Sequence, residues 1–140
     1  MLASETLSNQ ADTLGLTVSP NRVVCAGNIS SVSNLIIPED FVDMYRKLVV
    51  PWGFGELGYI TYKRTYARPV IGEDRTEEWA ETVARCVNGA QEIGAGYTHD
   101  EAERLYDYMF NLIGALSGRS LWLLGTDVVR KFGAPGLQNC

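Results

Sequence analysis

The sequence is poor in histidine and cysteine, with one His and three Cys among 140 residues. Cys25, Cys86 and Cys140 lie far apart, and they form neither a C-x-x-C pair nor the even set of a disulfide framework. His99 alone cannot complete a zinc site of the usual cysteine/histidine kind within the chain. These counts exclude a disulfide-stapled domain and a zinc-stabilised domain.

Long apolar runs are missing as well. A membrane-spanning helix needs roughly 20 apolar residues, whereas the run Leu48-Val49-Val50 stops at Pro51. The N-terminus has no basic start followed by an apolar block, so we expect no secretory signal. We therefore expect no membrane partner, and a cytoplasmic location follows by default.

Positive charge is in deficit, because 12 basic residues face 17 acidic ones and give a net charge of −5. Proteins bind nucleic-acid backbones through Lys and Arg that neutralise phosphates, so the net charge argues against a nucleic-acid partner for the surface as a whole. This leaves room for a local basic patch. The hydrophobic share of 46% and the charged share of 21% are typical of one soluble globular domain.

The first 37 residues differ in composition from the rest of the chain. They are rich in Ser, Asn, Thr and Gly, and they predict a loosely ordered arm over residues 1–37 with a short strand near 22–25. Pro38 and the two acids after it predict the start of a helix, which Pro51 ends. The apolar face of this helix is predicted to consist of Phe41, Met44, Tyr45 and Leu48.

Residues 56–68 are ambiguous between helix and strand. Leu57, Ile60 and Arg64 share one helical face, whereas the run Tyr-Ile-Thr-Tyr within this segment favours a strand. We favour a helix that Pro69 closes.

A third helix is predicted to begin at Thr76, which can cap it, and to end near Gly89. Glu77 and Glu78 lie in its first turn, where the helix dipole alone explains acidic residues. Its apolar stripe is predicted to consist of Trp79, Val83, Cys86 and Val87. A buried free thiol on such a stripe behaves as a small hydrophobic side chain.

The next helix has the clearest signal. Thr98 and Glu101 form a capping box, and Gly114 is predicted to terminate the helix. One face is predicted to carry Ala102, Leu105, Tyr106, Met109, Leu112 and Ile113. A short apolar segment at 121–124 follows, and Thr126 or the next residue then caps a brief helix through Phe132.

Gly53, Gly55 and Gly58 spell G-x-G-x-x-G, the pattern of a dinucleotide-binding turn. That turn needs a hydrophobic strand before the glycines, but the preceding segment predicts a helix that ends at Pro51. We interpret the glycines as a turn between helices.

A cluster of rings and positive charges follows at residues 59–68. Single-strand binding sites combine such residues, usually on a sheet. Lys63, Arg64 and Arg68 therefore define an alternative function, a helical module that binds nucleotides or single-stranded nucleic acid without catalysis. A purely structural interaction domain is a second alternative.

Five ordered blocks make the sequence more specific than its composition. Together they resemble the N-terminal part of the adenosylcobalamin-dependent (class II) ribonucleotide reductases, of the ribonucleoside-triphosphate reductase type. The resemblance covers about residues 38–140. The blocks are GYITYKRTYAR (58–68), TEEWAETVARCVNGA (76–90), DEAERLYDYMFNL (100–112), SGRSLWLLGTD (117–127) and the closing LQNC.

The resemblance implies a mainly α chain, namely a helical N-terminal domain over 38–133 followed at 134–140 by the start of the first strand of the catalytic α/β barrel. It also implies a parent enzyme that reduces the 2′-hydroxyl of ribonucleotides. In that family adenosylcobalamin generates a thiyl radical on a cysteine, and two further cysteines supply the reducing electrons. Thioredoxin or a similar dithiol then reduces their disulfide.

Cys140 matches the family's redox cysteine on the first barrel strand. Asn139 and Ser117, the latter in the turn at 116–120, resemble positions on the substrate side of the barrel mouth. The radical cysteine, the partner cysteine, the cobalamin site and the C-terminal thiols of the family have no counterpart in the sequence. We therefore expect a fragment that is inactive alone, produced by truncation, by gene splitting, or at an intein junction where Cys140 is the first intein residue.

Overall fold

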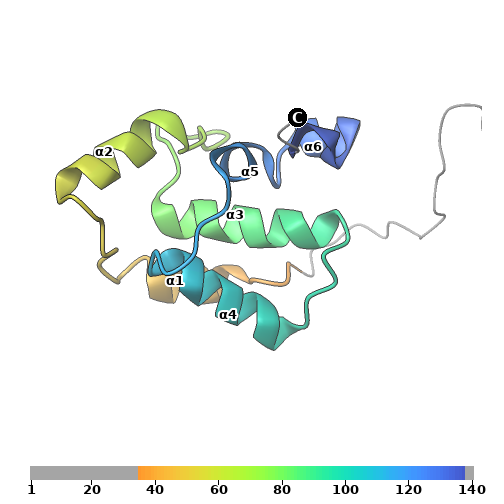
Figure 1. The fold of residues 1–140 in the computed structure, drawn as a ribbon, viewed down its shortest axis with the longest axis horizontal. Helices are drawn as coiled ribbons and strands as arrows, with labels where there is room; N and C mark the ends of the chain where they lie inside the picture. Colours follow the sequence, from red (N-terminus) through yellow and green to blue (C-terminus); the bar gives the residue numbers. More distant parts are fainter. Residues whose placement is uncertain (1–34, 138–140) are drawn as a thin grey trace, which may run out of the picture. The chain divides into compact units, whose positions relative to one another are not determined.

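The computed structural model describes residues 35–137, which form six α-helices and one short 3₁₀ helix (Figure 1). Among these residues the only extended pairing is an isolated antiparallel bridge between Pro69 and Thr76. The mainly helical fold class predicted from the sequence is confirmed. The elements are α1 (Glu39–Tyr45), α2 (Glu56–Thr65), α3 (Trp79–Glu92), α4 (His99–Phe110), α5 (Gly118–Leu123), α6 (Asp127–Phe132) and η1 (Ala134–Leu137).

Helix α3 is the centre of this unit. It contacts α1, α4 and α5, and Figure 1 shows α1 and α4 on one side of it and α5 on the other. Because α3 has neighbours on both sides, much more than one stripe of it is buried. The predicted stripe is confirmed, and the buried residues of α3 are Trp79, Ala80, Thr82, Val83, Ala84, Cys86, Val87 and Gly89.

The predicted ends of α3 were wrong. Glu78, not Thr76, is the N-cap, because the Glu81 carboxylate accepts a 2.8 Å hydrogen bond from the Glu78 backbone N–H. The helix also continues through Gly89 to Glu92. Gly89 does not end the helix. A glycine is needed at this position because another part of the backbone approaches it too closely for a side chain.

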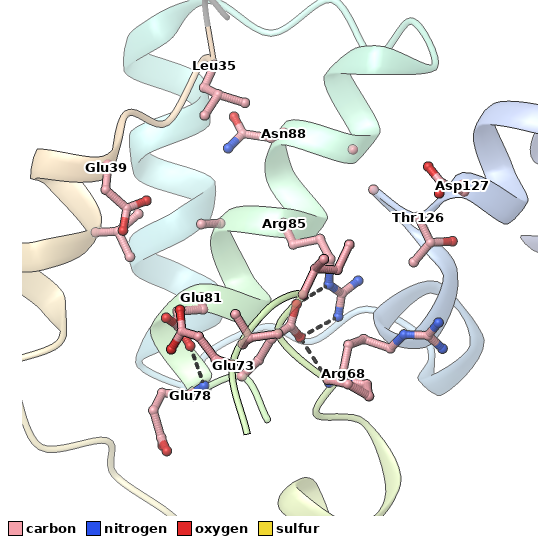
Figure 2. A pocket seen from close by; sticks show the side chains of 18 of the residues that line it. Leu35, Glu39, Arg68, Glu73, Glu78, Glu81, Arg85, Asn88, Thr126 and Asp127 are labelled. Carbon is pink, nitrogen blue, oxygen red and sulfur yellow. Dashed lines mark hydrogen bonds and ion pairs between the residues drawn. The ribbon is translucent and has the colours of Figure 1, made fainter. Parts of the chain in front are cut away.

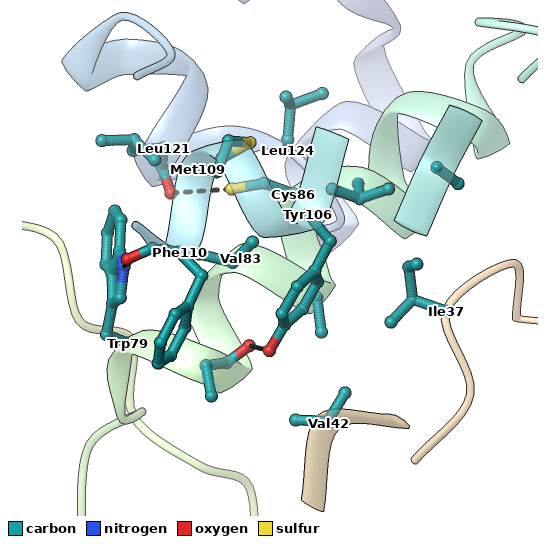
Figure 3. Close-up of a cluster of buried hydrophobic side chains, with 14 of the residues drawn as sticks. Ile37, Val42, Trp79, Val83, Cys86, Tyr106, Met109, Phe110, Leu121 and Leu124 are labelled. Atoms are coloured by element: carbon teal, nitrogen blue, oxygen red, sulfur yellow. Dashed lines mark hydrogen bonds between the residues drawn. The ribbon is translucent and has the colours of Figure 1, made fainter. Parts of the chain in front are cut away.

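Helix α4 packs against α3 through polar as well as apolar contacts (Figure 3). The Trp79 indole N–H donates to the Phe110 carbonyl at 3.1 Å, and the Tyr106 hydroxyl donates to the Ala80 carbonyl at 3.0 Å. Both bonds cross the core between the two helices. Aromatic side chains can be fully buried here because their polar ends have partners.

The capping box of α4 is confirmed, since the Thr98 backbone N–H donates to the Glu101 carboxylate and the Glu101 N–H to the Thr98 hydroxyl. The predicted end at Gly114 was wrong. The helix ends at Phe110, and the next residue but one, Leu112, takes a positive φ of 56°. Ile113 consequently lies beyond the helix and is exposed.

Helix α1 is shorter than predicted, and its predicted apolar face is confirmed only in part, because Phe41 and Tyr45 pack against the core and the other two residues do not. It ends at Tyr45, and Met44 and Leu48 are both 56% exposed. Val42 is the buried residue of the helix. The Tyr45 ring packs on two rings of α4, which fixes the orientation of α1 and leaves Met44 on the outer side. Spacing alone does not distinguish the inward pair, Phe41 and Tyr45, from the outward pair.

The helical interpretation of residues 56–68 is confirmed, although α2 ends at Thr65 rather than at Pro69. Its predicted face was wrong, because Leu57 and Ile60 are exposed. Tyr62 is the buried residue instead, and its ring stacks on that of Trp52 with centroids 5.4 Å apart. Aromatic stacking at the α2–α3 side of the core thus decides which face of α2 is turned inward.

The boundary of the predicted arm was also wrong. Ile37 is fully buried, and the Asn88 side chain binds both its backbone groups, accepting from the N–H at 2.9 Å and donating to the carbonyl at 3.1 Å. The core therefore includes residues that the composition assigned to the arm. Residues 1–34 and 138–140 are outside the described part of the chain, and the predicted strand at 22–25 lies there.

At the C-terminal end, the helix predicted through Phe132 is confirmed as α6, with Thr126 as N-cap. Ala134–Leu137 forms η1, whereas the start of a strand was predicted over 134–140. Pro135 fixes φ near −65°, which suits a 3₁₀ turn. Within residues 35–137 no helix has the length and apolar character that crossing a membrane requires.

Candidate functional site

A charged groove of about 1220 Å³ runs beside α3 (Figure 2). It is lined by α1, by the loop before α3, by one side of α3 itself, by the segment that joins α5 to α6 and by α6. Arginines and carboxylates both line it. These charges come from segments far apart in the sequence, and contacts between them hold those segments together.

An ion pair between Glu77 and Arg85 lies in this groove. The Arg85 Nε donates to Glu77 Oε1 at 2.7 Å, and Nη2 donates to Oε2 at 3.0 Å, so the pair is bidentate. The two side chains are only 11% and 13% exposed. A buried pair of this kind costs free energy to desolvate, and breaking it leaves an uncompensated buried charge.

The same guanidinium also binds the C-terminal end of α5. Arg85 Nη1 donates to the Leu124 carbonyl at 2.6 Å, and Nη2 donates to the Leu121 carbonyl at 2.9 Å. Carbonyls at the end of a helix have no partner within the helix, so these bonds satisfy them. Burial alone would lower the pKa of Arg85, but the hydrogen bonds and negative charge of Glu77 outweigh burial and raise it.

Glu77 has further partners on the opposite side. Its Oε2 accepts from the Thr82 hydroxyl at 2.7 Å and from the Arg68 backbone N–H at 3.2 Å. The Tyr62 hydroxyl donates to the Glu77 backbone carbonyl at 3.0 Å and lies 2.8 Å from Thr82 Oγ1. Glu77 therefore connects α2, α3 and the loop between them. Burial, the largest influence, raises the pKa of the Tyr62 hydroxyl.

The outer end of the groove carries a second, more exposed network. Arg75 binds both Glu81 oxygens at 2.7 and 2.9 Å, and Arg46 donates to Glu81 Oε1 at 2.9 Å. Burial would raise the pKa of Glu81, but the hydrogen bonds from Arg75, the Glu78 N–H and Arg46 lower it to about 2. The Glu81 carboxylate is therefore charged at neutral pH.

This arrangement suits holding segments together better than carrying out chemistry. Four groove arginines already bind carboxylates of the same chain, namely Arg46, Arg75, Arg85 and Arg130. An incoming anion would have to displace those carboxylates. Among the described residues no group of three or more His, Cys, Asp and Glu side chains is arranged to hold a metal ion.

Ser117 is described, whereas Asn139 and Cys140 lie outside the described residues. Ser117 is the N-cap of α5, and its Oγ accepts from the Ser120 N–H at 3.2 Å and lies 2.9 Å from the Ser120 hydroxyl. The cap explains a serine at this position. The contact of Ser117 with substrate stays a prediction, as do the roles of Asn139 and Cys140.

The basic residues of the nucleic-acid alternative are largely engaged. Lys63 Nζ donates to the Glu77 carbonyl at 3.0 Å and to the Glu78 carboxylate at 2.7 Å. The Arg68 guanidinium lies over the Trp122 ring, 5.4 Å from its centroid. Only Arg64 projects outward as that alternative requires. Gly53 and Gly55 lie in the turn before α2, where no strand precedes them in the described chain.

Sequence reasoning missed the importance of Glu77 and Arg85. Glu77 was interpreted as a first-turn acid explained by the helix dipole, but it precedes the N-cap and is buried against Arg85. The two residues are eight positions apart, whereas ion pairs along one helix join residues three or four apart. Their spacing in the sequence therefore does not predict the pair. The signal in the sequence that could have indicated a buried pair is Arg85, a charged residue on the same helix as the apolar stripe.

Comparison with known proteins defines the class. The family model described as "Ribonucleotide reductase alpha domain" matches residues 37–126, which is most of the described structure. A solved structure described as a crystal structure of B-12 dependent (class II) ribonucleotide reductase aligns with a TM-score of 0.64 and 37% identity, covering 74% of this chain and 16% of that chain. The chain thus belongs to the ribonucleotide reductase alpha domain family.

Several relatives carry the name adenosylcobalamin-dependent ribonucleoside-triphosphate reductase. The one from Lactobacillus delbrueckii subsp. bulgaricus is 41% identical over 113 residues, covering 72% of this chain and 15% of the relative. The one from Lactobacillus acidophilus is 35% identical over 122 residues, covering 79% and 16%. The resemblance found in the sequence is confirmed, and the chain spans about 15–16% of the length of these relatives.

Proposed function

We propose that this chain is the N-terminal helical part of an adenosylcobalamin-dependent ribonucleotide reductase that converts ribonucleoside triphosphates to 2′-deoxyribonucleotides. The observation that carries the proposal is the 41% identity to a named reductase across 72% of the chain. The aligned fold of a class II enzyme supports it. The complete enzyme acts in the cytoplasm, where deoxyribonucleotides are used for DNA synthesis.

The cofactor belongs to the part of the enzyme outside this chain. The groove beside α3 does not fit it, because four of the five groove arginines are already bound by carboxylates from the same chain. When bound elsewhere, adenosylcobalamin supplies the radical chemistry of the reaction. In residues 35–137 we assign no residue to the cofactor.

The role proposed for Cys140 is that of one redox thiol. A thiyl radical on a cysteine outside this chain abstracts the ribose 3′-hydrogen, and the 2′-hydroxyl takes a proton from a thiol and leaves as water. After the 2′ carbon has been reduced, the same hydrogen returns to the 3′ carbon and the thiyl radical is restored. Cys140 and a second cysteine, also outside this chain, supply two electrons and become a disulfide. A dithiol such as thioredoxin then restores both thiols. Ser117 and Asn139 are proposed to line the substrate side of the same site.

A chimera tests this role. Residues 38–140 of this chain replace the matched segment of the Lactobacillus delbrueckii enzyme, and reduction of ribonucleoside triphosphate is assayed with adenosylcobalamin and a dithiol. Cys140→Ser should abolish turnover while nucleotide binding stays largely intact. Cys86→Ala is the matched control, since this buried thiol has no redox role, and it should retain turnover. Unchanged turnover in Cys140→Ser would remove the redox role.

A further inference from the structure

Arg85 joins the segment before α3 to the C-terminal end of α5. Its guanidinium donates two hydrogen bonds to Glu77, which precedes α3, and two to the carbonyls of Leu121 in α5 and of Leu124, the C-cap of α5. We call these groups the Glu77–Arg85 clamp. Figure 2 shows the Arg85 side chain extending from α3 into the groove.

The backbone just after α5 is held against α3 by a second contact. A β-carbon on Gly125 would stand 2.6 Å from the Arg85 carbonyl oxygen, and one on Gly89 would stand 2.1 Å from the Gly125 nitrogen. No side chain separates the two segments here. The clamp and this close approach act on consecutive residues, Leu124 and Gly125, and together they fix where the chain leaves α5.

The same contacts determine the position of everything that follows in the described chain. Helix α6 begins two residues after Gly125, and η1 packs against both α5 and α6. Leu137, the last residue of η1, packs against the hydrophobic core. In the sequence, Cys140 follows Leu137 by three residues.

We propose that the Glu77–Arg85 clamp positions the segment that carries Cys140. It holds the end of α5 against α3, and so sets the path along which residues 126–137 approach the redox site. This inference rests on the proposed function. Arg85 is a positioning residue, since it reaches Cys140 only through the backbone of α5, α6 and η1.

Arginine is required for this task because one planar group must bind a carboxylate on one side and two carbonyls on the other. A lysine keeps the charge but has one nitrogen, whereas Arg85 reaches the carboxylate and the two carbonyls from three separate nitrogens, so lysine cannot reproduce all four hydrogen bonds. Arg85→Lys therefore separates the positioning role from the mere presence of a positive charge.

Hydrogen exchange in the 140-residue chain tests the clamp directly. In Arg85→Lys we expect faster amide exchange in residues 121–137 and unchanged exchange in α4. Arg75→Lys is the matched control, because Arg75 also forms a bidentate pair, but its hydrogen-bond partners are Glu73 and Glu81 and not α5. Amide exchange of residues 121–137 in Arg75→Lys should match wild type. A uniform rise in amide exchange over all helices in Arg85→Lys would show a general loss of stability and would overturn the inference.

The functional consequence is measured in the chimera. Arg85→Lys should lower kcat about tenfold or more, normalised to folded protein, while KM for the nucleotide stays within about twofold. Wild-type kcat in Arg85→Lys would overturn the positioning role. If the wild-type chimera itself makes no deoxyribonucleotide while exchange in Arg85→Lys rises only over 121–137, the clamp stands and the proposed function fails.

Discussion

Gly89 in α3 lies directly against Gly125, the residue that leads from α5 into α6, so closely that a β-carbon on Gly89 would stand 2.1 Å from the Gly125 nitrogen. The neighbouring Arg85 binds the carbonyls at the end of α5. Two glycines and one arginine thus bring the C-terminal helices onto the central helix. A change in any of these residues is expected to act on the same joint.

Gly89→Ala should destabilise the protein by about 2 kcal/mol or more, because backbone atoms have to move apart to admit a methyl group. The higher helix propensity of alanine, worth about 1 kcal/mol, works against this loss. Urea unfolding followed by circular dichroism measures the difference. Gly114→Ala is the control, since a β-carbon there meets no atom within 4 Å. Equal stability of the two variants would contradict the close approach.

Tyr62→Phe should cost roughly 1–2 kcal/mol of unfolding free energy. The lost hydroxyl donates to the Glu77 carbonyl and contacts Thr82, and all of these groups are in the buried network. Tyr108→Phe removes a hydroxyl from an exposed ring and should leave stability nearly unchanged. If the two substitutions cost the same in urea unfolding, the network does not stabilise the fold as described.

The Cys86 thiol should be unreactive in the folded protein. It is fully buried, and burial raises its pKa to about 11, so almost no thiolate is present at about pH 8. Iodoacetamide labelling followed by peptide mapping should show modification of Cys86 only after unfolding in urea. Labelling of the native protein as fast as that of the unfolded chain would show that Cys86 is accessible.

Glu81 should stabilise the fold in a pH-dependent way. Its pKa is about 2 in the folded protein against 4.5 ordinarily, so the folded state favours the charged form. The resulting stabilisation is fully present above about pH 4.5 and is lost as the pH falls through about 2. Glu81→Gln keeps the oxygen that caps α3 but loses the charge.

The difference in urea-unfolding free energy between wild type and Glu81→Gln should therefore be largest near neutral pH and shrink on acidification. Glu56→Gln is the control, an exposed acid for which the described residues provide no ion pair. Its difference from wild type should be small at each pH. A difference for Glu81→Gln that does not change with pH would contradict the charge-based explanation.

Local signals in the sequence predicted the fold well. The capping box of Thr98 and Glu101 and the cap at Thr126 involve residues within one turn of each other, and both are found where predicted. The ends of helices were predicted less well. Gly89 looked like a helix end, but it is the site of a close approach, and that approach depends on a segment more than thirty residues away.

The candidate site was predictable only in part. Residues such as Cys140 and Asn139 were assigned from resemblance to a family, and the comparisons confirm the family without describing those residues. The Glu77–Arg85 pair escaped prediction because its geometry arises from tertiary contacts between α3 and α5. Ile37 was missed for a similar reason, since the Asn88 side chain binds it from a distant helix.

The most direct measurement compares deoxyribonucleotide formation by the 140-residue chain and by the chimera that carries its residues 38–140 in the Lactobacillus delbrueckii reductase. Both are incubated with ribonucleoside triphosphate, adenosylcobalamin and a dithiol, and the product is identified by mass spectrometry. We predict product from the chimera and none from the chain alone. Turnover by the chain alone, or a folded chimera that fails where the parent reductase succeeds, would contradict the account.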